Sequence, residues 1–149
     1  MITLKRTDSE NADFRHLLTF LDANLAANDG DEHWFFAQFN TLDDIKHVVI
    51  AYQENTPVGC GAIKAYSTAQ AEVKRVFVAE QARNRGIASQ IMHELEHWAK
   101  ELGFTECILE TGIKQLEAVQ LYPKLGYHNI PNYEPYVGVA LSVCFAKKL

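Results

Sequence analysis

Apolar residues recur along the chain at two different spacings, and these spacings distinguish helices from strands. Near the N-terminus the step is three or four residues, through Phe14, Leu17, Leu18, Leu21 and Leu25. This pattern predicts an amphipathic helix over residues 11–27, ending before the turn-forming Asn28-Asp29-Gly30. A group of aromatic residues then predicts a second, shorter helix around Trp34, Phe35, Phe36 and Phe39.

Two further helices are expected in the second half of the chain. The first has an apolar stripe formed by Ile87, Ile91, Leu95, Trp98 and Leu102. The second covers residues 115–125. In both cases a glycine, Gly103 or Gly126, supplies the stop signal at the C-terminal end.

Runs of β-branched and other apolar residues predict the strands. Their expected ranges are 2–6, 47–52, 58–66, 72–78, 105–111 and 137–146. A turn at Glu54-Asn55-Thr56-Pro57 joins the second and third of these into a hairpin. Antiparallel hairpins early in the chain and a β-α-β-α-β order later predict an α/β fold, with one mixed central sheet and helices on both faces.

Length and composition indicate one globular domain over residues 1–149. A chain of this length buries about two-thirds of its extended surface on folding, which is enough for one core. The net charge of −5 argues against nucleic acid or an anionic membrane as a partner and favours a cationic substrate. The chain has no signal-peptide pattern and no apolar run that could span a membrane, so the expected location is the cytoplasm.

The hexapeptide Arg83-Asn84-Arg85-Gly86-Ile87-Ala88 lies between a predicted strand and a predicted helix. At such a junction, unpaired backbone N–H groups and the positive end of the helix dipole point outward and form a site for a phosphate group. Gly86 lets the main chain approach closely, and Ala88 is too small to shield it. An ordinary strand–helix turn with solvated arginines is the alternative.

This hexapeptide resembles the signature of the GNAT N-acetyltransferase superfamily, Arg/Gln-x-x-Gly-x-Gly/Ala, through Arg83, Gly86 and Ala88. The stretch Leu121-Tyr122-Pro123-Lys124-Leu125-Gly126-Tyr127 is similar to the family's second motif, in which a tyrosine on the last helix precedes a Gly-aromatic turn. The two motifs occur in the expected order and cover residues 72–128. The resemblance implies the GNAT fold for the whole chain.

The resemblance also implies acetyl-CoA as the cofactor. Its pyrophosphate would lie on the backbone amides of Arg83, Asn84, Arg85, Gly86, Ile87, Ala88 and Ser89, and its pantetheine arm along Val76, Phe77 and Val78. The family often has asparagine seven positions before the tyrosine, and Gln115 stands there in this sequence. A basic patch on an otherwise acidic chain agrees with an anionic cofactor, and it comprises Lys74, Arg75, Arg83 and Arg85.

The implied reaction is direct acetyl transfer to a primary amine of a small molecule or a protein, because no activated cysteine or serine is evident. An amine is mostly protonated at neutral pH, so a base must accept a proton. Glu72 lies eleven positions before Arg83, the offset of the general-base glutamate in the histone-acetylating branch resembled here. Tyr122 is expected to protonate the departing thiolate or to hydrogen-bond its sulfur. The alternative for Glu72 is an exposed strand carboxylate that pairs with Lys74. The alternative for Tyr122 is a half-buried helix aromatic without a catalytic role.

The acceptor amine is expected near two polar segments. Asp31, Glu32 and His33 could hold an ammonium group, or could form an acidic loop that caps the following helix. Tyr133 and Tyr136 could form a wall of the same pocket, or could be surface aromatics. The partners are therefore acetyl-CoA and an amine acceptor, and a homodimer is one option for the assembly.

A competing motif is His93-Glu94-Leu95-Glu96-His97, which satisfies the HExxH pattern of zinc hydrolases. The apolar stripe of this helix leaves both histidines and all three nearby glutamates facing solvent, whereas a catalytic zinc needs an enclosed site. We therefore predict no metal site. A non-catalytic acyl-CoA sensor is the remaining alternative, although such a protein would need neither Tyr122 nor Glu72.

Overall fold

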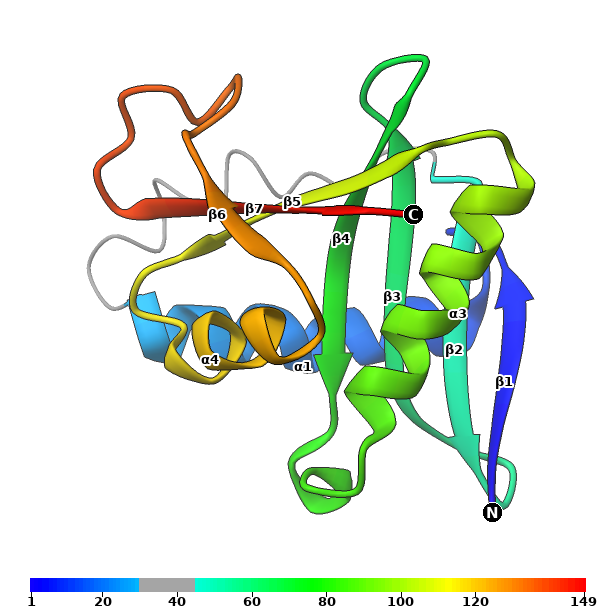
Figure 1. The fold of residues 1–149 in the computed structure, drawn as a ribbon. Coiled ribbons are helices and arrows are strands. Elements are labelled where there is room, and N and C mark those ends of the chain that lie inside the picture. The colour runs from blue at the N-terminus through cyan, green and yellow to red at the C-terminus, as the bar shows by residue number, and fades with distance from the viewer. Residues whose placement is uncertain (30–44) are drawn as a thin grey trace.

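The computed structural model describes residues 1–29 and 45–149, and its strands form one twisted sheet with the order β1-β2-β3-β4-β5-β7-β6 (Figure 1). The strands are β1 (Ile2–Thr7), β2 (His47–Gln53), β3 (Thr56–Ala65), β4 (Gln70–Val78), β5 (Glu106–Gly112), β6 (His128–Ile130) and β7 (Ser142–Lys148). The helices are α1 (Ala12–Asp29), α3 (Ile87–Glu101) and α4 (Leu116–Lys124), with a short 3₁₀ turn, η2 (Glu80–Ala82).

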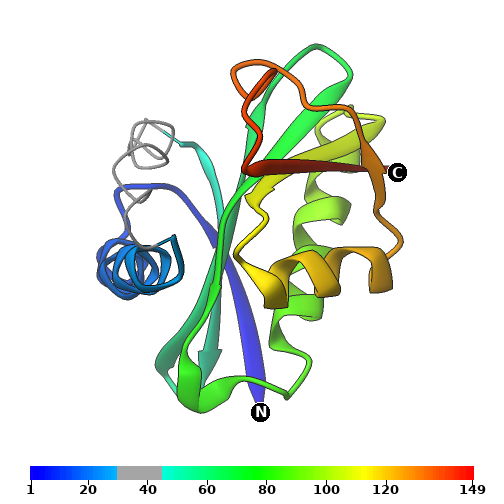
Figure 2. The same ribbon diagram turned by 90° about the vertical axis from the view of Figure 1, so that its left-hand side faces the viewer.

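The sheet is mixed, as predicted. β4 and β5 run parallel, and every other neighbouring pair is antiparallel. Helix α1 covers one face of the sheet, and α3 and α4 cover the other (Figure 2). The expected α/β fold with helices on both faces is therefore confirmed, including the hairpin between β2 and β3.

The central strands are apolar on both sides because both faces of the sheet are covered. In β2, Val48 and Ile50 pack in the core under α1, while Val49 and Ala51 pack in the core under α3. The alternation of side chains along a strand divides these residues between two cores. A continuous apolar run is therefore the pattern that this strand requires.

Helix α3 approaches the sheet closely because β3 carries two glycines beneath it. A Cβ atom added at Gly61 would lie 2.8 Å from Cδ1 of Leu95 and 2.9 Å from Cγ2 of Ile91. At Gly59 it would lie 3.0 Å from Cδ1 of Ile91. These contacts fix the position of the helix whose first turn forms part of the cleft described below.

The predicted apolar stripe of α3 was wrong at its C-terminal end. Leu102 lies beyond the last residue of the helix and is 44% exposed. The buried face instead continues through Met92, Glu96 and Ala99. Glu96 is buried because it accepts hydrogen bonds from the Tyr127 hydroxyl and the Lys147 ammonium, both at 2.9 Å, so the expectation that it faces solvent was also wrong.

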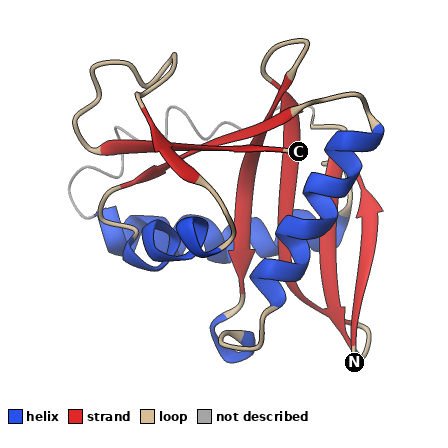
Figure 3. Cartoon of the chain, viewed as in Figure 1, coloured by secondary structure: helices blue, strands red, loops and turns tan. Residues whose placement is uncertain are grey.

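The last strand begins later than predicted, at Ser142 rather than 137, and the preceding segment is a loop (Figure 3). The side-chain amide of Asn132 lies within 3.1 to 3.2 Å of the carbonyl oxygens of Tyr136, Val139 and Ser142, which holds this loop together. The short strand β6 was not predicted, because it forms by pairing with β7 rather than from its own pattern.

Two further sequence predictions concern a second short helix and the absence of a membrane-spanning segment. The short helix expected around Trp34–Phe39 lies outside the described residues. Within the described ranges, no helix is long and apolar enough to cross a membrane.

We expect the Gly61→Ala substitution to lower the free energy of unfolding by about 1 to 3 kcal/mol, because the added methyl group meets Leu95 and Ile91 in a packed core. Urea unfolding would measure this change. Thr68→Ala in the exposed β3–β4 turn is the control and should change stability by less than about 0.5 kcal/mol. Equal stability of the two variants would contradict the close packing of α3.

Candidate active site

A cleft of about 790 Å³ lies where β4 and β5 separate. The two strands pair only from Gln70 to Glu72 on β4 and from Glu106 to Ile108 on β5. Beyond this point they diverge (Figure 1), and the cleft occupies the space between them. Its other walls are the first turn of α3, most of α4 and part of α1. Because β4 pairs here only with β3 and has no ladder partner on its β5 side among the described residues, the backbone from Val76 to Val78 borders the cleft.

A β-bulge in β4 changes which side chains face the cleft. Cys60 pairs with Phe77 and Ala62 pairs with Lys74, so three steps along β4 match two steps along β3. Arg75 at the bulge has a φ of 62°. Val73 and Val76 both pack in the core under α3, so the two residues between them face the α1 side.

The loop before α3 presents a continuous run of backbone donors. The N–H groups from Asn84 to Ser89 have no hydrogen-bond acceptor within the described residues. Asn84 and Gly86 adopt φ values of 66° and 74°, and Gly86 caps α3 without a side-chain hydrogen bond. Such an arrangement at the positive end of a helix dipole binds anions.

Arg83 begins this loop and contributes its side chain rather than its backbone amide. Its N–H donates to the Glu80 carbonyl oxygen at 3.3 Å. The guanidinium donates to the Val78 carbonyl oxygen at 3.0 Å and lies 3.8 Å from the Glu117 carboxylate. Arg85 donates to the Gln53 side chain at 3.2 Å. The available amides therefore start at residue 84, one position later than the sequence predicted.

Tyr122 on α4 is buried and lines the cleft. Its ring packs edge-to-face with Tyr127, with 5.8 Å between ring centroids, and at a tilt against Phe145. No group in residues 1–29 or 45–149 hydrogen-bonds to its hydroxyl. Burial raises the pKa of Tyr122, so the phenol keeps its proton at neutral pH. Gln115, at the start of the same helix, is also buried and lines the cleft.

Glu72 is joined to the predicted acceptor residues by a cluster of tyrosines. Its carboxylate accepts a hydrogen bond of 2.7 Å from the Tyr133 hydroxyl and lies 3.6 Å from the Lys74 ammonium. The Tyr133 ring packs edge-to-face between Tyr66 and Tyr136, at 4.9 and 5.6 Å. Burial, and then the charge of Glu72, raise the pKa of Tyr133. Glu72 is itself buried and does not line the cleft, whereas Lys74 does.

Glu110 on β5 is a second carboxylate near the cleft, and it was not among the site residues predicted from the sequence. It lines the cleft and accepts a hydrogen bond of 2.6 Å from the Ser142 hydroxyl. It lies two residues beyond Ile108, the last β5 residue that pairs with β4. A glutamate directly after the apolar run Cys107-Ile108-Leu109 was the available signal, but only the strand register shows that it borders the cleft.

Comparison with known proteins identifies the family. The sequence matches the model of the Acetyltransferase (GNAT) family over residues 10–127. The chain belongs to this family. It is 36% identical over 107 residues to the IAA acetyltransferase of Azospirillum brasilense, a match that covers 71% of this chain and 69% of the relative.

Solved structures agree with the assignment of this chain to the acetyltransferase family. A Klebsiella pneumoniae protein described as an acyl-CoA N-acyltransferase has a TM-score of 0.83 and 29% identity, covering 100% of this chain and 98% of its own. A GNAT family acetyltransferase from Elizabethkingia anophelis, solved with acetyl-CoA bound, has a TM-score of 0.70 and 18% identity, covering 99% and 98% of the two chains. The second likeness supports the fold alone.

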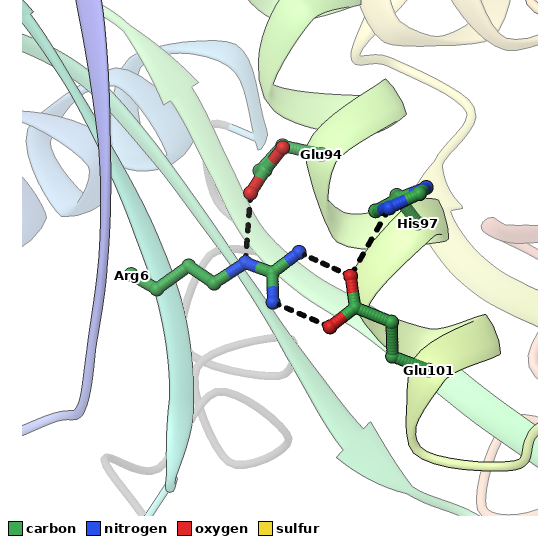
Figure 4. Close-up of polar contacts among 4 residues, drawn as sticks. All are labelled: Arg6, Glu94, His97 and Glu101. Atoms are coloured by element: carbon green, nitrogen blue, oxygen red, sulfur yellow. Dashed lines mark hydrogen bonds and ion pairs between the residues drawn. The ribbon is translucent and has the colours of Figure 1, made fainter.

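The HExxH motif of the acetyltransferase belongs to an ion-pair network on the far side of α3. Nε of Arg6 donates to Glu94 at 2.7 Å, and the two terminal nitrogens donate to Glu101 at 2.8 and 2.9 Å (Figure 4). His97 lies 3.1 Å from the same Glu101 carboxylate. In the part of the chain that the structure describes, no three His, Cys, Asp or Glu side chains gather into a metal-binding group. The motif thus joins α3 to β1.

The structure brings together most of the residues that the sequence singled out. Those that line the cleft are Val76, Phe77, Val78, Arg83, Asn84, Gly86, Ile87, Ala88, Ser89, Gln115 and Tyr122. Arg85 points to Gln53, while Glu72, Tyr133 and Tyr136 form the adjoining cluster. Asp31, Glu32 and His33 lie outside the described residues.

Proposed function

We propose that this acetyltransferase transfers an acetyl group from acetyl-CoA directly to a primary amine. The observation that carries the proposal is the run of unbonded N–H groups from Asn84 to Ser89, at the mouth of the cleft between β4 and β5. Six such donors at a helix N-terminus suit the diphosphate of acetyl-CoA, the co-substrate of the family. The backbone edge of β4 at Val76 and Phe77, which has no partner on the β5 side among the described residues, suits the amide groups of the pantetheine arm. We also propose that residues 1–149 act as one domain, because the seven strands share one sheet.

The proposed reaction is a single displacement. The amine nitrogen attacks the thioester carbonyl, the C–N bond forms and the C–S bond breaks. The excess proton of the amine goes to a carboxylate, and the leaving thiolate takes a proton from the Tyr122 hydroxyl. An acyl-cysteine intermediate is disfavoured, because burial raises the pKa of Cys60 and Cys107 to about 12.

Two carboxylates are candidates for the proton acceptor. Glu72, the residue chosen from the sequence, would act through the Tyr133 hydroxyl or a water molecule, because it does not line the cleft. Glu110 lines the cleft and could receive the proton directly. The hydrogen bond from Ser142 holds the Glu110 carboxylate in place.

The phosphate site is tested by Ala88→Asp. An aspartate in the first turn of α3 suits the helix dipole and so preserves folding, but its charge repels the diphosphate. We expect at least about a tenfold loss of acetyl-CoA affinity by calorimetry. The control is Gln90→Asp, which adds the same charge at an exposed position of α3 outside the cleft. Equal affinities of the two variants would remove the basis of the proposed function.

We expect Tyr122→Phe to lower kcat by about 10² to 10⁴-fold, because the thiolate loses its proton donor. Affinity for acetyl-CoA should change little, since the ring remains. Thiol release at saturating acetyl-CoA measures the rate. Tyr127→Phe, whose hydroxyl contacts Glu96 outside the cleft, serves as the matched control and should retain kcat. A Tyr122→Phe enzyme with undiminished kcat would exclude the proton-donor role.

The pH dependence of kcat/KM distinguishes the two carboxylates. We expect Glu110→Gln to reduce the rate more than Glu72→Gln, because Glu110 borders the cleft. Without its base, the enzyme should regain part of its rate as the pH rises and more of the acceptor becomes neutral. If Glu72→Gln shows the larger loss and this recovery, then Glu72 is the base and the proton passes through Tyr133 or water.

A further inference from the structure

The bulge in β4 places two cationic side chains on the same face of the sheet. In a regular strand, Lys74 and Arg75 would point to opposite faces. Here Val73 and Val76 occupy the core under α3, which leaves both basic residues on the α1 side. Arg75 lies 3.8 Å from Asp22 of α1, in agreement with this placement. Both residues line the cleft.

The Lys74 ammonium has capacity to bind an anion. Its side chain is 14% exposed, and its nearest carboxylate oxygen, on Glu72, is 3.6 Å away. This separation exceeds the range of a good hydrogen bond. Within the described residues, the three N–H donors of Lys74 donate no hydrogen bond. A largely buried ammonium without hydrogen bonds is costly unless a ligand supplies an acceptor.

The same pocket contains negative charge. Glu110 lines the cleft, and Glu72, outside the lining, has its carboxylate 3.6 Å from the Lys74 ammonium. An acceptor with several ammonium groups would place further positive charge beside Lys74 and Arg75, which is unfavourable in a partly buried site. An acceptor with one amine and one acidic group would match both signs.

We propose that the acceptor carries a carboxylate close to its amine, as a free amino acid does, and that Lys74 binds this carboxylate. The positive charge of Arg75 strengthens the local field, while Glu110 faces the amine. The inference rests on the proposed function and specifies its substrate class. The acceptor is small, because the cleft of about 790 Å³ must also hold the acyl-pantetheine arm. The local charges thus reverse the preference for a cationic substrate that the net charge of the chain indicated.

Matched acceptors test the proposal with the wild-type enzyme. Leucine, phenylalanine and lysine are each compared with their carboxamide and with the amine that lacks the carboxylate, and free thiol release is followed. Within each series we expect the acid to have at least about a tenfold higher kcat/KM than either analogue, as the loss of one charge-assisted hydrogen bond requires. The carboxamides lose the ammonium proton more easily, so a preference for the acids cannot arise from the reactivity of the amine.

Three variants then locate the carboxylate site. Lys74→Gln should raise KM for the acids by about tenfold and reduce their advantage over the carboxamides. Lys74→Arg retains the charge and should keep part of that advantage. Lys100→Gln removes the same single positive charge as Lys74→Gln, but at an exposed position of α3. It should leave the advantage of the acids over the carboxamides unchanged.

The outcomes separate this inference from the proposed function. Equal or faster turnover of the uncharged analogues by the wild-type enzyme would overturn the amino-acid class and leave amine acetylation intact. Bound acetyl-CoA by calorimetry, with no turnover of any acid, would also overturn it. A lack of acetyl-CoA binding would instead refute the proposed function. Should Lys74→Gln fail to fold, the wild-type acceptor series and Lys74→Arg decide the question.

Discussion

The separation of β4 from β5 after a short parallel ladder is the constraint on which the site depends. Pairing stops at Glu72 and Ile108, so the sheet opens within its own plane and leaves a polar strand edge beside a cleft. A continuous ladder would satisfy these backbone groups internally and leave no space for a ligand. The packing of α3 on the glycines of β3 then holds the loop before α3, with its unbonded N–H groups, beside this opening.

The bulge in β4 links the geometry of the sheet to its electrostatics. One additional residue shifts the alternation of side chains, so neighbouring basic residues share the α1 face while the core under α3 remains apolar. The loop between β6 and β7 adds Tyr133, whose hydroxyl binds Glu72. The cleft therefore combines a run of backbone donors with charged side chains, and the tyrosine cluster adjoins it. We propose the backbone donors for the cofactor and the charged side chains for the acceptor.

Polar networks away from the cleft support this arrangement. Buried Glu96 connects α3 to Tyr127 and to Lys147 on β7, and Arg6 connects β1 to α3 through two carboxylates. The hydrogen bond between Arg6 and Glu101 is the main cause that raises the pKa of Arg6 and lowers the pKa of Glu101. A motif that resembles a zinc site in the sequence thus stabilises the contact between helix and sheet.

The sequence by itself determined the order of most elements, the position of the loop before α3 and the place of Tyr122 on the last helix, because helix periodicity, a glycine cap and a short motif are encoded within a few neighbouring residues. It did not determine β6, the start of β7 or the burial of Glu96, which depend on partners far along the chain. The position of Glu110 and the contact between Tyr133 and Glu72, 61 residues apart, follow from strand register and loop placement. Only the tertiary structure decided them, since a shift of one residue in a strand turns every side chain to the opposite face.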